Sequence, residues 1–172
     1  IATKEAISIG YIGNIVDLLE HLEESDVIPD LCSDQTSLHN PWLGGYIPRN
    51  MTHGEASQML SDDPEKFRKM VKSTLVDHGD VINRLSGKGM KFWDYGNAFL
   101  LEASRAGADI GKDGSFKYPS YVENIMGPMC FDFGFGPFRW VCSSGSREDL
   151  KITDEIAKEV LLEQSYNAPD EI

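Results

Sequence analysis

The chain has 172 residues, and its 28 acidic and 16 basic side chains give a formal net charge of −12 at pH 7. Hydrophobic residues make up 41% of the chain and aromatic residues 10%, which is typical of a folded domain and excludes a disordered tail. The negative charge argues against nucleic acid or an anionic membrane surface as the main partner. No apolar run approaches the roughly 18 residues that a membrane span needs.

The cysteines and the two ends of the chain give further expectations. Cys32, Cys130 and Cys142 are an odd number without metal-ligand spacing, so we expect reduced thiols, no metal site and a cytoplasmic protein. No secretory leader is visible. The chain begins at Ile1 and ends in a polar, linker-like stretch over 167–172. We therefore expect an interior segment of a longer polypeptide.

Strand and helix patterns alternate from the beginning of the chain. An apolar run predicts a strand over 6–11. A Gly13–Asn14 turn follows, and the helical spacing beyond it predicts a helix with Asn14 as its N-cap. A short strand is predicted over 30–33. The following stretch, 34–50, is rich in turn formers and has no periodicity, which is typical of a functional loop.

The same alternation continues in the middle of the chain. Two helices are predicted to begin at the capping-box spacing of Thr52 and Glu55 and at the pair Asp63–Pro64, and the second should bury one apolar face. A third strand is predicted over 90–95, and a second Gly-Asn turn at 96–97 leads into another helix. Such strand–turn–helix units predict an α/β fold with parallel strands.

The pattern is weaker in the last third of the chain. A polar, glycine-rich loop is predicted over 111–115 and a short helix over 119–126. A strand is predicted over 138–142, and a final amphipathic helix over 153–164.

The densest polar stretch, 34–41, follows the second predicted strand and carries hydroxyl, amide, imidazole and carboxylate groups. Ligands of open α/β sheets bind at the carboxyl ends of the strands, so this stretch and the two Gly-Asn turns form a candidate ligand site. A turn held together by its own side chains explains the composition equally well. Taken alone, His39 is more often structural than catalytic.

Aromatic residues and one cation offer further candidates. Trp42, Tyr46, Trp93 and Tyr95 lie near glycines, where a flat ring can pack on a ligand ring; core packing is the alternative and is favoured for Trp93. Arg139 is a lone cation in an apolar, aromatic stretch. It either clamps an anionic ligand or pairs with one of the many acidic side chains.

Together these motifs resemble the urocanase (urocanate hydratase) family in order and spacing over nearly the whole chain. The matching runs are Ile7-Ser8-Ile9-Gly10 with Gly13-Asn14, the run from Ser33 to Pro41, Gly44-Gly45-Tyr46, the run from Phe92 to Ala98, and the run from Gly134 to Trp140.

The resemblance implies a fold and an activity. The fold is α/β, a Rossmann-like parallel sheet portion flanked by helices, with part of a second core domain. Residues 1–110 would belong to the NAD-binding domain and 111–172 would connect into the core or substrate domain. Such enzymes use tightly bound NAD as an electrophile and add water to urocanate, giving 4-imidazolone-5-propionate in histidine degradation. The implied full-length protein is a cytoplasmic homodimer that acts on this small molecule and binds neither nucleic acid nor membrane.

Site residues follow from the same resemblance, position by position. Arg139 would pair with the urocanate carboxylate. The family's active-site cysteine and its glycine-rich pyrophosphate-binding run are expected outside this chain, so no catalytic residue is assigned and the chain alone should be inactive. The implied NAD contacts are Asn14, Ile15, Gln35, Thr36, Ser37, Leu38, His39, Tyr46, Ile47 and Tyr95.

Two other functions stay open. The first is an NAD-dependent dehydrogenase that shares only the dinucleotide-binding half, which would release reduced cofactor during turnover. The second is a non-catalytic module that binds a nucleotide or a protein partner. The NAD-binding prediction requires the stretch 35–39 and Tyr95 to converge on one crevice shaped for a pyridine nucleotide.

Overall fold

The computed structural model describes residues 6–34, 40–96, 98–112, 115–134, 136 and 142–166. The chain divides into two compact units, Ile1–Ile125 and Met126–Ile172. The sequence-based division lies after residue 110, whereas the stretch up to Ile125 belongs to the first unit. Which unit serves the cofactor and which the substrate stays a prediction.

The first helix, α1 (Ile15–Glu24), begins where its cap predicts. The Asn14 side chain accepts a hydrogen bond from the backbone N–H of Val16 at 2.9 Å. The strand predicted over 6–11 is wrong, because this stretch has no regular secondary structure and Ile7 and Ile9 are 71% and 83% exposed. An apolar alternation becomes a strand only where a neighbouring backbone pairs with it.

Helices α2 (His53–Asp62) and α3 (Pro64–Gly87) also begin at their predicted caps. The Thr52 hydroxyl accepts from the N–H of Glu55 at 3.2 Å, while the Glu55 carboxylate accepts from the N–H of Thr52 at 2.8 Å. The side chain of Asp63 caps α3 by accepting from the N–H of Lys66 at 3.0 Å, and Pro64 occupies the first helical turn.

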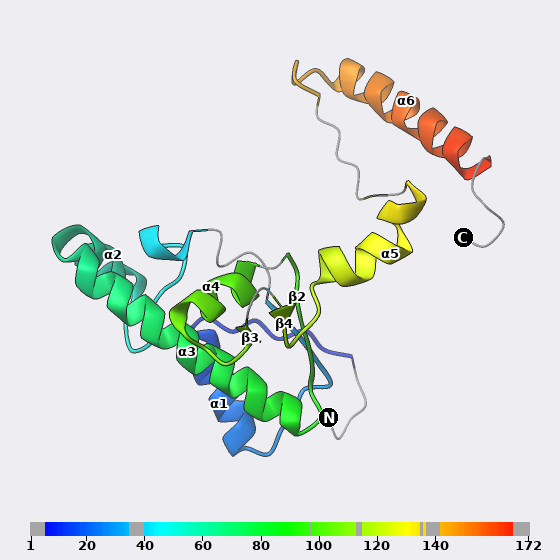
Figure 1. The fold of residues 1–172 in the computed structure, drawn as a ribbon. Coiled ribbons are helices and arrows are strands. Elements are labelled where there is room, and N and C mark those ends of the chain that lie inside the picture. The colour runs from blue at the N-terminus through cyan, green and yellow to red at the C-terminus, as the bar shows by residue number, and fades with distance from the viewer. Residues whose placement is uncertain are drawn as a thin grey trace. The chain divides into compact units, whose positions relative to one another are not determined.

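Helix α3 is the centre of the first unit and packs against α1, α2 and α4 (Ala98–Ala106) (Figure 1). At Gly79 an added Cβ would lie 2.7 Å from the Cβ of Ala108 and 3.3 Å from Cγ2 of Ile110, so only glycine permits this close approach. The predicted apolar face of α3 is confirmed. Its buried residues recur at helical spacing: Phe67, Val71, Thr74, Leu75, His78, Gly79, Val81, Ile82 and Leu85.

Strands β1 (Leu31–Asp34) and β2 (Lys91–Asp94) pair in parallel, with Leu31 opposite Lys91 and Asp34 opposite Asp94. Both strands therefore end at the same edge, and the predicted parallel α/β arrangement is confirmed. Along β2 the side chains of Phe92 and Asp94 are buried, whereas Trp93 is half-buried. The core position expected for Trp93 is thus taken by Phe92, because neighbouring strand residues point to opposite faces.

The stretch 111–115, predicted as a loop, contains short strands. Strands β3 (Gly111–Lys112) and β4 (Ser115–Phe116) pair antiparallel. The helix predicted over 119–126 is confirmed as a π-helical turn, η2 (Tyr121–Met126).

The second unit contains α5 (Gly127–Met129), a 3₁₀ turn η3 (Phe131–Phe133) and α6 (Arg147–Tyr166). Helix α6 begins earlier and ends later than the predicted 153–164, and none of its residues is buried. The strand predicted over 138–142 falls on positions that, apart from Cys142, lie outside the described residues. No helix in the described part of the chain has the length and apolar character to cross a membrane.

Candidate functional site

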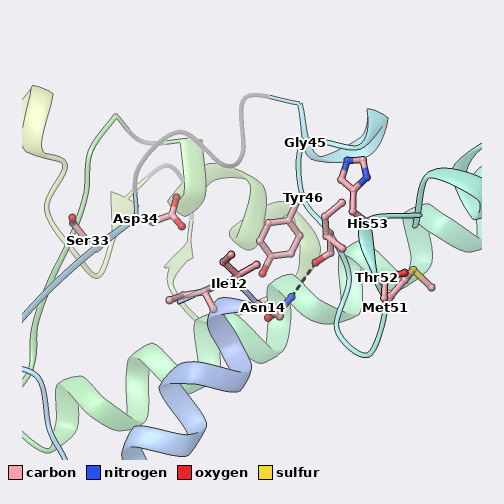
Figure 2. Close-up of a pocket in the computed structure, with 12 residues that line it drawn as sticks. Ile12, Asn14, Ser33, Asp34, Gly45, Tyr46, Met51, Thr52 and His53 are labelled. Atoms are coloured by element: carbon pink, nitrogen blue, oxygen red, sulfur yellow. Dashed lines mark hydrogen bonds between the residues drawn. The ribbon is translucent and has the colours of Figure 1, made fainter. Parts of the chain in front are cut away.

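A pocket of about 720 Å³ lies in the first unit where β1 ends and where α1 and α2 begin (Figure 2). It lies at the carboxyl end of a parallel strand, which is the usual ligand position in α/β sheets. Its walls are supplied by the α1 turn, the end of β1, the loop before α2 and the first residue of α2. The lining residues are Ile12, Gly13, Asn14, Ile15, Ser33, Asp34, Gly45, Tyr46, Ile47, Met51, Thr52 and His53.

Asn14 joins two walls of the pocket. Its side-chain oxygen caps α1, and its Nδ2 donates to the backbone carbonyl of Ile47 at 2.9 Å, the dashed line in Figure 2. One amide therefore satisfies a helix N-terminus and fixes the loop across from it. An aspartate or serine could supply the cap, but only an amide also supplies this donor.

Replacing Asn14 by alanine should lower the free energy of unfolding by about 2 kcal/mol, because a helix cap and a hydrogen bond to the loop are lost together. Asn14→Ser is the matched control, since its hydroxyl can cap α1 but is too short to reach the Ile47 carbonyl. It should lose only about 1 kcal/mol. Urea unfolding followed by circular dichroism measures both variants. Equal stability of Asn14→Ala and the unsubstituted chain would contradict the dual role.

The loop before α2 is also held by Arg49. Its Nε donates to Asp17 at 2.7 Å and its Nη2 to Glu20 at 2.5 Å, both on α1. Its backbone N–H donates to the Thr74 hydroxyl of α3 at 3.1 Å. This part of the pocket wall has no regular secondary structure, so polar contacts to two helices hold it in place.

Tyr46 forms the most buried aromatic wall of the pocket. Its hydroxyl is hydrogen-bonded to Nδ1 of His78 at 3.2 Å, and its side chain is only 5% exposed. Burial, and then the negative charge of Asp34, raises the pKa of the Tyr46 phenol far above its usual range. Tyr46 therefore stays protonated and neutral at physiological pH.

The end of β1 brings a carboxylate to the pocket. Asp34 lines the pocket from the end of β1, whereas Tyr46 lines it from the loop before α2 (Figure 2).

The Cys32 thiol lies two residues before Asp34. Burial, and then the charge of Asp34, raises the pKa of this thiol to about 11. Cys32 is half-buried, packs against the core and stays a protonated thiol at physiological pH.

The helix ends at this pocket are partly satisfied by their own side chains. In α1 the N–H of Val16 is bonded to Asn14, and at α2 the N–H groups of Thr52 and Glu55 are bonded within the capping box. A ligand here would be held mainly by side chains and apolar walls rather than by a nest of open amides. Among the described residues no group of three or more acidic, histidine or cysteine side chains could hold a metal ion.

The structure brings four of the sequence-predicted site residues to one pocket: Asn14, Ile15, Tyr46 and Ile47. Tyr95 lies outside the lining, although its N–H donates to the carbonyl of Asp34 at 3.0 Å. Its ring stacks on Tyr121, with centroids 5.3 Å apart.

Other predicted site residues lie outside the described part of the chain: Gln35, Thr36, Ser37, Leu38, His39 and Arg139. The expected convergence of 35–39 and Tyr95 on one crevice therefore stays a prediction. Trp42, a candidate ring for ligand packing, is not in the pocket lining; its Nε1 donates to Glu102 at 3.0 Å and it packs against the core.

Sequence reasoning missed Thr52, His53 and His78. The capping box at Thr52 predicted a helix start, and the same signal could have placed His53 at the ligand edge beside it. His78 falls between Leu75 and Ile82 on the apolar face of α3, so a histidine at a core position was a visible signal. Its partner could not be read from the sequence, because Tyr46 lies in a separate loop.

A parallel α/β unit with a pocket at the strand ends belongs to the class of Rossmann-like domains. Comparison with known families agrees with this class. Residues 1–125 match the family model described as the urocanase Rossmann-like domain, and residues 128–169 match the urocanase C-terminal domain. The chain therefore belongs to the urocanase family.

Relatives carry the same family name. The chain is 54% identical over 164 residues to a probable urocanate hydratase of Caenorhabditis elegans and 57% identical over 163 residues to one of Dictyostelium discoideum. It is 51% identical over 167 residues to the urocanate hydratase of Mus musculus. These matches cover 92% of the chain but only 24%, 24% and 25% of the relatives, so the chain spans about a quarter of their length.

Proposed function

We propose that the full-length protein carrying this chain is a urocanate hydratase that binds NAD in the pocket at the end of β1. The observation that carries the proposal is the 50–57% identity to proteins named urocanate hydratase over almost all of the chain. The proposed enzyme adds water to urocanate and gives 4-imidazolone-5-propionate, a step of histidine degradation. The proposed setting is cytoplasmic, with a homodimer as the assembly.

The pocket chemistry fits part of a dinucleotide. The Asp34 carboxylate and the Asn14 amide suit hydroxyl and amide groups of a ligand, whereas Ile12, Ile47 and the Tyr46 ring suit a flat ring. Further proposed NAD contacts are Tyr95 and the run from Gln35 to His39, which lies outside the described residues. NAD, when bound, supplies an electrophilic nicotinamide ring.

The proposed work of this chain is binding and orientation. Asn14 and Arg49 hold the loop that carries Tyr46 and Ile47, so the cofactor would meet a preformed wall. We assign Arg139 to the urocanate carboxylate, because a guanidinium matches a carboxylate with two parallel hydrogen bonds. We assign no residue of this chain to the water-addition step itself.

The test uses the full-length protein. Added urocanate should lose its ultraviolet absorbance, and acid-denatured protein should release NAD close to one equivalent per chain. Absorbance of reduced cofactor should not rise during turnover, because hydration leaves the oxidation state unchanged. Unchanged urocanate would contradict the hydratase activity. Accumulating NADH would favour the dehydrogenase instead.

A further inference from the structure

His78 forms a buried hydrogen-bonded pair with the pocket residue Tyr46 and has no part in the assignments above. The His78 ring is 1% exposed and lies between two aromatic rings. Its centroid is 4.5 Å from that of Phe99 and 6.3 Å from that of Tyr46, and the Tyr46 and His78 planes differ by only 15°. The 3.2 Å hydrogen bond between the Tyr46 hydroxyl and Nδ1 is therefore enclosed by apolar surface.

Because the hydrogen bond is enclosed, its loss would decide where the Tyr46 hydroxyl points. A buried hydroxyl without a partner costs more free energy than a modest change of side-chain rotamer. If His78 offered no partner, Tyr46 would lower its free energy by turning its hydroxyl toward the open space it lines. That space is the pocket between α1 and the loop before α2.

We propose that His78 is a positioning residue: it holds the Tyr46 hydroxyl against α3 and so keeps the tyrosine ring out of the volume that the cofactor occupies. The inference rests on the proposed NAD pocket. Phe99 supports the same arrangement by packing against the imidazole with its ring tilted by 54°. His78 itself is buried and does not line the pocket.

The test is a double-mutant cycle on the full-length protein, with NAD affinity measured by equilibrium dialysis. His78→Phe fills the same space without a hydrogen-bond partner and should raise the dissociation constant for NAD about tenfold. His78→Asn keeps an acceptor near the position of Nδ1 and should raise it by no more than about twofold. The Tyr46→Phe/His78→Phe double variant should bind NAD as Tyr46→Phe alone does, because no hydroxyl is left to turn.

Leu85→Ala is the control for general destabilisation, since Leu85 is fully buried on the same helix but does not line the pocket. Its NAD dissociation constant should not change in protein that circular dichroism shows to be folded. Wild-type affinity in His78→Phe, or losses that multiply in the double variant, would overturn the positioning role. If the unsubstituted protein binds no NAD, the proposed function fails first and the positioning role fails with it.

Discussion

Acidification from about pH 7 to about pH 4 should lower the free energy of unfolding of the chain by about 3 kcal/mol through His78 alone. Complete burial lowers the pKa of the His78 imidazole from 6.5 to about 3. The folded chain therefore holds this ring neutral in a range where the unfolded chain protonates it.

The sign of the effect follows from proton uptake. Between the folded pKa of about 3 and the unfolded value of 6.5, the unfolded chain binds one more proton at this residue. Stability consequently falls as the pH falls. The contribution is complete above the unfolded pKa and is lost progressively toward the folded one.

His78→Asn provides the comparison, because asparagine does not titrate. Glu23 and Glu55, whose pKa values are lowered by Arg84 and by the backbone N–H of Thr52, titrate in both proteins and cancel in the difference. Guanidinium unfolding at a series of pH values measures the effect. The difference in unfolding free energy between the unsubstituted chain and His78→Asn should shrink on acidification. Parallel pH profiles of the two proteins would refute the assignment of this effect to His78.

Asp94→Ala should cost about 3 kcal/mol of unfolding free energy, a second effect of this size. Asp94 is 1% exposed at the end of β2, and its two carboxylate oxygens accept from the N–H of Gly96 at 3.2 Å and of Leu100 at 3.0 Å. Alanine would leave both amides without this partner and would free the start of α4. Tyr95 should keep its place, because its backbone N–H donates to Asp34 and its ring stacks on Tyr121.

Two variants separate this role from a general loss of charge. Asp94→Asn keeps a carbonyl acceptor for one of the two amides and should lose about half as much stability. Asp80→Ala removes an exposed carboxylate from α3 and should leave stability within about 0.5 kcal/mol. Urea unfolding of the three variants provides the comparison. An Asp94→Ala variant as stable as Asp80→Ala would exclude the capping role.

The helices of the first unit were predictable because each carries its own start signal and one apolar face. Asn14, Thr52 and Asp63 cap the helices that their positions predicted. The strand predicted over 6–11 failed for a different reason. A strand depends on a neighbouring backbone, and the residues of that neighbour are not encoded in the alternation itself.

The candidate site was predictable only in part. The family resemblance pointed to Asn14 and Tyr46, and the structure brings both to one pocket. The capping role of Asp94 was missed because it spans six positions, from the end of β2 to the N–H of Leu100, and no helix-start pattern has that spacing. The pairing of Tyr46 with His78 joins residues far apart in the chain, so no local pattern reveals it.

The contact at Gly79 sets a rule for how relatives can change. Helix α3 approaches Ala108 so closely that a methyl group at position 79 would clash with the methyl group at position 108. Only one of the two positions can therefore carry a Cβ atom at this helix distance. A relative with alanine at the first should carry glycine at the second, or should separate its helix from the segment that follows α4.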